Sequence, residues 1–83
     1  MKHAGQSALS RLEPLLAELR QIGGLVERSR GVFYRRGRAW LHFHEHGDRL
    51  FADLRAVDGG DFERIDVSDE IGQAALLKAA ARG

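Results

Sequence analysis

Between residues 32 and 67 the chain alternates apolar and polar residues in four short runs, and only two to four residues separate each run from the next. Alternation with a period of two is typical of a β-strand that has one buried face. Connections this short join only antiparallel neighbours, because a parallel crossover needs a dozen or more residues. The sequence therefore predicts an antiparallel meander of four strands: Val32–Arg36, Ala39–His46, Arg49–Val57 and Phe62–Val67.

A helical pattern precedes the predicted strands. Leucine and isoleucine recur every three or four residues from Ser10 to Ile22, which indicates one apolar helical stripe. Ser10 with Glu13 fits a capping box, and Pro14 falls in the first turn, where proline is tolerated. Gly23-Gly24 then ends the pattern. We expect one helix over residues 10–22.

A second helical pattern follows the strands. Ser68 is a good helix cap, Asp69 and Glu70 suit a first turn, and the alanine-rich segment that follows favours a helix. Its expected buried stripe is Ile71, Ala74 and Leu77. The predicted fold is therefore α+β, a four-stranded antiparallel meander with one face covered by an amino-terminal and a carboxy-terminal helix.

Size and composition limit the class of protein. With 83 residues, 43% hydrophobic and 30% charged, we expect a single globular domain over residues 1–83, with residues 1–7 as a disordered tail. The absence of cysteine excludes disulfides, thiolate nucleophiles and cysteine zinc sites. No apolar run approaches the roughly 20 residues of a membrane span, and no apolar leader opens the sequence. The expected location is the cytoplasm.

The turn at Gly47-Asp48 determines how the second and third predicted strands pair. A two-residue hairpin loop places His42 opposite Asp53 and His44 opposite Phe51. Because side chains alternate between the faces of a strand, this register separates two sets of residues. The face expected to pack on the helices contains Val32, Tyr34, Leu41, Phe43, Leu50, Ala52, Leu54, Ile65 and Val67. The opposite face contains Phe33, Arg35, Trp40, His42, His44, His46, Phe51, Asp53, Arg55, Phe62, Arg64 and Asp66.

This opposite face, called the outer face below, mixes aromatic residues with histidine, arginine and aspartate, whereas a solvated sheet face is normally polar. Burying a phenylalanine is worth about 1.5–3 kcal/mol, so several exposed together favour contact with another molecule. The predicted binding face is Phe33, Arg35, Trp40, His42, His44, Phe51, Asp53 and Arg55. Our leading interpretation is a non-enzymatic binding or assembly domain that meets another protein through this face, most simply a second copy of the chain in a homodimer.

The run HFHEH supplies three histidines on one strand face: His42, His44 and His46. Neighbouring Cβ atoms on such a face are roughly 7 Å apart, a spacing from which two imidazoles converge on one metal ion. With Asp53 beside His42, the candidate transition-metal ligands are His42, His44 and Asp53. The competing structural interpretation pairs His42 with Asp53, packs His44 on Phe51 and leaves His46 in solvent.

Catalysis and nucleic-acid binding are the alternative functions. A small metal-dependent or His/Asp acid–base enzyme would use His42, His44 and Asp53, but only four serines and no threonine or cysteine offer a nucleophile, so no catalytic residue is assigned. A candidate surface for single-stranded nucleic acid consists of Arg35, Arg36, Arg38 and Trp40. Acidic residues gather on the fourth predicted strand and would repel nucleic acid, so charged edges that prevent aggregation explain the pattern more simply.

The segment from Gly31 to Arg55 resembles the central part of a group of small uncharacterised bacterial proteins. The shared patterns are F-Y, L-H-F-H-E and F-A-D-(L/V)-R, and the segment covers less than half of the chain. The resemblance implies a compact α+β fold and a bacterial source, and it supplies no catalytic residues, because no activity is established for that group. A looser similarity, a hairpin followed by a strand with Phe-Ala-Asp, relates the chain to the MmcQ/YjbR-like and TfoX-N-terminal-like domains, for which nucleic-acid roles have been proposed.

Overall fold

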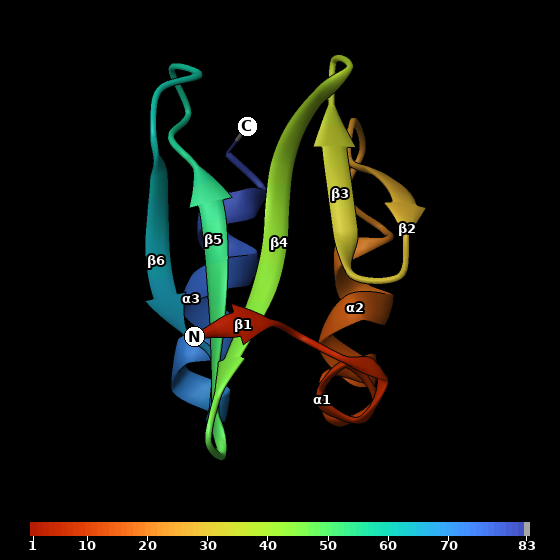
Figure 1. Cartoon of the computed structure of the whole chain (residues 1–83). Coiled ribbons are helices and arrows are strands. Elements are labelled where there is room, and N and C mark those ends of the chain that lie inside the picture. Colours follow the sequence, from red (N-terminus) through yellow and green to blue (C-terminus); the bar gives the residue numbers. More distant parts are fainter. Residues whose placement is uncertain (83) are drawn as a thin grey trace.

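The computed structural model describes residues 1–82 and contains one antiparallel sheet with three helices (Figure 1). The elements in chain order are β1 (Lys2–His3), α1 (Gln6–Arg11), α2 (Glu13–Leu19), β2 (Val26–Ser29), β3 (Val32–Arg35), β4 (Arg38–His46), β5 (Arg49–Arg55), β6 (Phe62–Asp66) and α3 (Glu70–Ala80). The sheet order is β2-β3-β4-β5-β6, and β1 pairs separately with β4. The α+β class and the antiparallel meander are confirmed, whereas the predicted count of four strands is wrong.

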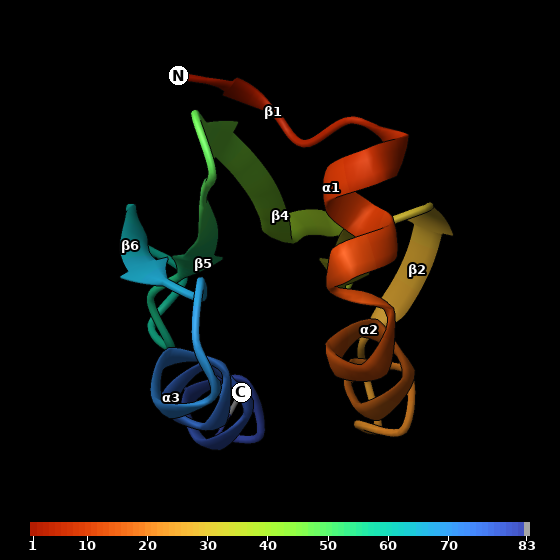
Figure 2. The same ribbon diagram turned by 90° about the horizontal axis from the view of Figure 1, so that it is seen from below.

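α2 and α3 form a second layer on one side of the sheet (Figures 1 and 2). Figure 1 shows α2 and α3 behind the sheet and β1 in front of β4, and the turned view in Figure 2 shows the same separation. α3 contacts β5 and β6, and α2 contacts α3. No helix within residues 1–82 is long and apolar enough to cross a membrane.

The first predicted helix is divided into α1 and α2. Leu12, between them, has a φ of −99° and a ψ of 6°, and Pro14 lies at the start of α2. Proline lacks the N–H that would bond to Ser10, four residues earlier, so a continuous helix is interrupted here. The predicted cap at Ser10 is wrong, since α1 already begins at Gln6.

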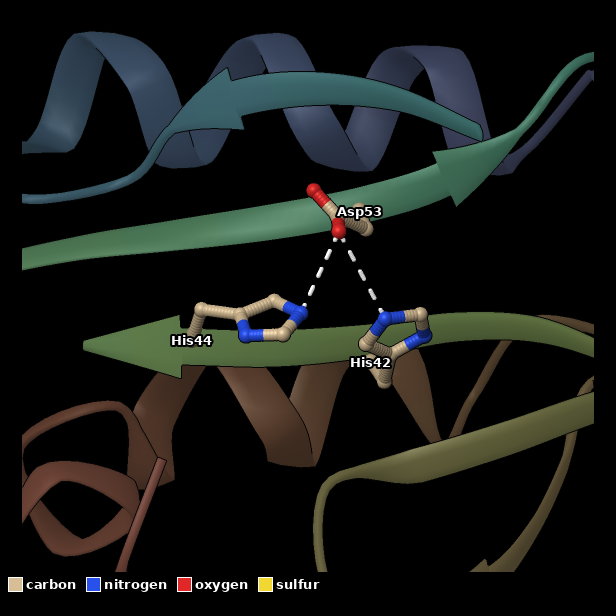
Figure 3. Close-up of side chains that lie close together, drawn as sticks. All are labelled: His42, His44 and Asp53. Atoms are coloured by element: carbon tan, nitrogen blue, oxygen red, sulfur yellow. Dashed lines mark ion pairs between the residues drawn. The ribbon is translucent and has the colours of Figure 1, made fainter. Parts of the chain in front are cut away.

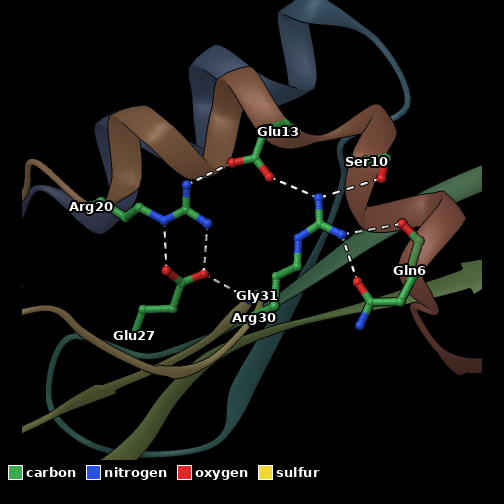
Figure 4. A network of polar contacts seen from close by, with 7 residues as sticks. All are labelled: Gln6, Ser10, Glu13, Arg20, Glu27, Arg30 and Gly31. Atoms are coloured by element: carbon green, nitrogen blue, oxygen red, sulfur yellow. Dashed lines mark hydrogen bonds and ion pairs between the residues drawn. The ribbon is translucent and has the colours of Figure 1, made fainter.

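A polar network joins α1 and α2 to the β2–β3 hairpin (Figure 4). Arg20 pairs with both Glu13 and Glu27, and Arg30 also bonds to Glu13. Glu27 in turn accepts a hydrogen bond of 2.9 Å from the Gly31 N–H. Single exposed ion pairs contribute little to stability, but this connected set fixes the position of β2, a strand absent from the sequence-based prediction.

The core confirms the predicted alternation in β4 and β5 and corrects it in α3. Its fully buried large side chains are Leu12, Leu15, Leu16, Leu19, Phe33, Leu41, Val67 and Leu76. The predicted core residues Leu41, Phe43, Leu50, Ala52, Leu54 and Val67 are all buried. In α3 the buried residues are Leu76 and Ala80, whereas Ile71 is 82% exposed. The predicted stripe of Ile71, Ala74 and Leu77 is therefore displaced around the helix.

The alternation predicted for β3 is wrong. The turn falls at Arg36-Gly37, one residue earlier than predicted, and both residues have positive φ, as a type I′ hairpin requires. β4 then contains an irregularity at Trp40, because Phe33 pairs with Leu41 while Tyr34 pairs with Ala39. A shift of one residue exchanges the two faces of a strand, so Phe33 packs into the core.

The first residues, for which we expected a disordered tail, are strand β1 and the beginning of α1 in the structure. Lys2 and His3 pair with Glu45 and His44 of β4, and the Ala4 N–H continues this ladder by donating to the Phe43 carbonyl. β3 pairs only with the first part of β4. β1 therefore provides backbone partners where β3 has ended.

Candidate functional site

Five of the eight predicted binding-face residues lie on the outer face, and three do not. The five are His42, His44, Phe51, Asp53 and Arg55. Phe33 is fully buried, and Arg35 donates a hydrogen bond to the Ala80 carbonyl at the end of α3. Trp40 belongs to the core cluster and lies beneath the Arg35 guanidinium. The predictions for Phe33, Arg35 and Trp40 are corrected by the shifted turn and the irregularity in β4, which direct these side chains toward the helices.

The pairing of β4 with β5 follows the prediction, with His42 opposite Asp53 and His44 opposite Phe51. The side chains nevertheless converge more closely than a simple cross-strand pair (Figure 3). Nε2 of His42 lies 3.5 Å from Oδ2 of Asp53, and Nε2 of His44 lies 3.2 Å from the same oxygen. His46 is exposed at the hairpin tip and takes no part.

Asp53 is a nearly buried carboxylate held by a strong partner. Arg64 of β6 donates from Nε to Oδ1 at 2.7 Å and from Nη2 to Oδ2 at 2.8 Å. The Arg64 hydrogen bonds lower the pKa of Asp53 against the opposing effect of burial, and the charges of Arg64 and the two histidines add to the lowering. Asp53 is therefore ionised near neutral pH.

Burial controls the charge of His42. Desolvation lowers the pKa of His42; Asp53 opposes this effect, and His44, His3 and Arg64 reinforce it. The ring also meets Phe62 edge-on at a centroid distance of 4.9 Å. His42 is therefore neutral near pH 7, the form in which an imidazole binds a metal ion.

His44 has one ring nitrogen in contact with Asp53 and one without a partner. Nε2 faces Asp53, whereas Nδ1 is buried and has no hydrogen-bond partner within residues 1–82. A buried nitrogen of this kind is costly, because it has lost water without gaining a bond. The nitrogen available to a ligand shared with Asp53 is therefore Nε2, and Nδ1 lies on the opposite side of the ring.

One member of this cluster, His3, was missed by sequence reasoning. His3, on β1, stacks on His44 at a ring-centroid distance of 4.6 Å and lies 5.7 Å from His42. A two-residue strand has too little periodicity to be found from the sequence, so His3 gave no signal. Arg64 was placed on the outer face, and its pairing with Asp53 follows from the β5–β6 register.

The arrangement has the dimensions of a three-ligand metal site. One nitrogen from each imidazole and one carboxylate oxygen lie within 4.8 Å of one another. Two ligands on a tetrahedral ion at about 2.1 Å are roughly 3.4 Å apart, close to the two observed His–Asp separations. The two His–Asp pairs are therefore spaced as they would be around one ion.

The geometry offers less to acid–base catalysis. No hydrogen bond links a serine to a histidine within residues 1–82; Ser68 bonds to the backbone of Leu50, and Ser10 accepts from Arg30. The histidines and Asp53 thus have no bonded hydroxyl nucleophile in the part of the chain described.

No protein-family model, curated protein or solved structure matches this chain. The resemblance of Gly31–Arg55 to small bacterial proteins stays a prediction.

Proposed function

We propose that this chain is a small metal-binding domain that holds a divalent first-row transition-metal ion through His42, His44 and Asp53. The observation that carries the proposal is the approach of two imidazole nitrogens, 3.2 and 3.5 Å away, to one carboxylate oxygen. A neutral His42 and an ionised Asp53 are the protonation states that coordination requires.

The donor atoms decide the class of ion. Two imidazole nitrogens and one carboxylate oxygen suit zinc, copper, nickel or cobalt, whereas magnesium and calcium prefer oxygen ligands alone. Three protein ligands leave at least one position on the ion for another donor.

Arg64 competes with a metal ion for Asp53. It bonds to both oxygens of Asp53, including Oδ2, the oxygen that faces the histidines. Nearly half of the Arg64 side chain is exposed, so it can turn into solvent when an ion takes its place. Metal binding therefore exchanges one partner of Asp53 for another.

Calorimetric titration with zinc, nickel and copper tests the proposal. His42→Ala, His44→Ala and Asp53→Asn should each weaken binding of the preferred ion at least about tenfold, because each removes a ligand. His46→Ala is the matched control, since this exposed histidine lies on the same strand outside the cluster. No binding by the unaltered chain, or equal weakening by His46→Ala, would contradict the proposal.

Association of two copies through the outer face is the weaker proposal. Phe33 and Trp40 are buried within the chain, and two carboxylates of the outer face already have arginine partners. Asp53 pairs with Arg64, and Asp66 pairs with Arg49. Phe51 and Phe62 are half-buried on this face and still favour contact. Sedimentation at micromolar concentration tests it, and a monomer would exclude it.

Two of the four residues expected to contact nucleic acid, Arg35 and Trp40, are buried in the structure. Arg35 lies over the Trp40 ring and donates to the end of α3, and Trp40 is buried, so this tryptophan offers no stacking surface. The described geometry gives no reason to prefer this function.

A further inference from the structure

The amino-terminal strand is held over the proposed metal site by few interactions. β1 consists of two exposed residues that pair with His44 and Glu45 of β4. Its continuation is fixed by the Ala4 N–H, which donates to the Phe43 carbonyl at 3.0 Å, and by the Gly5 N–H, which donates to Oε2 of Glu45 at 2.7 Å. Segments with so little buried surface open more easily than the core does.

The pairing of β1 with β4 brings a third imidazole to the cluster. His3 and His44 are directly opposed in the antiparallel ladder, which places their side chains on the same face of the sheet. The His3 ring consequently stacks on His44 at 4.6 Å and lies 5.7 Å from His42. Its exposed imidazole makes no hydrogen bond or ion pair within residues 1–82, so it is free to turn toward an ion.

We propose that His3 is the fourth ligand of the metal ion and that metal binding fixes β1 on the sheet. This inference rests on the proposed function of His42, His44 and Asp53. With His3 added, the donors are three imidazoles and one carboxylate, a set that fills a tetrahedral zinc site and leaves no position for water. The ion then connects three strands, β1, β4 and β5, and the state of the amino-terminal segment reports whether metal is present.

Thermodynamic linkage gives the proposal a quantitative form. If His3 strengthens zinc binding by a certain factor, zinc must favour the docked position of β1 by the same factor. Removing an imidazole ligand should weaken zinc binding by about tenfold or more. The backbone amides of Ala4 and Gly5, which are bonded to β4 only while β1 is docked, should then exchange with solvent about tenfold more slowly when zinc is bound.

The experiment combines zinc titration with amide hydrogen exchange on the full chain. His3→Ala should weaken zinc binding about tenfold and abolish the zinc-dependent protection of Ala4 and Gly5. Lys2→Ala is the matched control, because Lys2 is the other residue of β1 and is exposed. It should leave both the affinity and the protection unchanged.

The outcomes separate this inference from the function on which it rests. If His42→Ala weakens zinc binding but His3→Ala changes neither affinity nor exchange, the fourth-ligand proposal is overturned while the three-ligand site stands. If the unaltered chain binds no zinc, both are overturned. If Lys2→Ala has the same effect as His3→Ala, the effect belongs to the strand and not to the imidazole, which also overturns the proposal.

Discussion

Replacing Arg64 by glutamine should strengthen metal binding, although it removes the strongest hydrogen-bond partner of a ligand. Arg64 occupies both oxygens of Asp53 at 2.7 and 2.8 Å, and an incoming ion must take Oδ2 from it. The substitution removes this competitor and also a positive charge that repels the cation. Both effects act in the same direction.

The expected size of the effect follows from the exposure of Arg64. The Arg64 side chain is 47% exposed, so its bond to Asp53 has the strength of a solvated ion pair. Removing this bond should change the equilibrium constant for zinc binding by about two- to fivefold. Loss of repulsion between the guanidinium and the ion adds to this factor. We expect zinc to bind Arg64→Gln roughly three- to tenfold more tightly than the unaltered chain.

Competition titration against a zinc chelator measures the change. Arg49→Gln is the control, because Arg49 lies on the same face and pairs with Asp66, which is not a proposed ligand. The control removes the same net charge without freeing Asp53. Equal affinities for the two variants, or weaker binding by Arg64→Gln, would refute the argument that Arg64 and the ion compete for one oxygen.

Three further predictions concern the fold. Leu76→Ala should lower the free energy of unfolding in urea by about 2–5 kcal/mol, because Leu76 is fully buried. Ile71→Ala, at an 82% exposed position, should change it by less than about 0.5 kcal/mol, and similar losses for the two variants would contradict the assignment of the buried face of α3. Gly31→Ala and Gly37→Ala both force alanine to a positive φ, but only at Gly31 would the new Cβ meet a leucine methyl of α1, at 2.6 Å. Gly31→Ala should therefore lower the melting temperature more than Gly37→Ala, and the reverse order would contradict the packing of α1. The hydrogen bonds from Arg49 and Ser68 lower the pKa of Asp66 to about 2, below its usual 3.8, so its contribution to stability is complete above about pH 4 and is lost as the pH falls toward 2. In Asp66→Asn the free energy of unfolding should depend less on pH in this range, and an unchanged pH dependence would show that the pairing is absent.

The register of β4 with β5 was predictable from a single turn. Gly47 has a φ of 61°, a conformation that suits glycine at a two-residue hairpin turn. The apolar alternation of both strands then leaves one pairing that buries Leu41, Phe43 and Leu54 together. For this reason the approach of His42 to Asp53 could be found from the sequence.

The position of the turn before β4 was harder to predict from the sequence. Arg36-Gly37 and Gly37-Arg38 both place one glycine in a two-residue loop, and the chain adopts the first, with arginine in the left-handed region. This difference of one residue moved Phe33 and Arg35 to the helical side. Trp40 followed because of the irregularity in β4, which no pattern in the sequence marks.

The remaining members of the site depend on contacts between distant segments. β1 is too short to show a period, so the approach of His3 to His44 is a product of tertiary pairing. β2 was missed for a related reason, since its residues are mostly polar and one of them, Glu27, is held by Arg20, the residue that caps α2. Local patterns thus located all three ligands of the proposed site, His42, His44 and Asp53, while the approach of His3 needed the fold.

Long-range nitrogen NMR of the imidazoles during zinc titration tests the central claim most directly. Coordination should shift ring nitrogens of His42 and His44 together at one equivalent of zinc, while the resonances of His46, at the exposed end of the same strand, stay in place. Shifts confined to His46, or no shift of His42 and His44 at saturating zinc, would show that this cluster holds no metal ion.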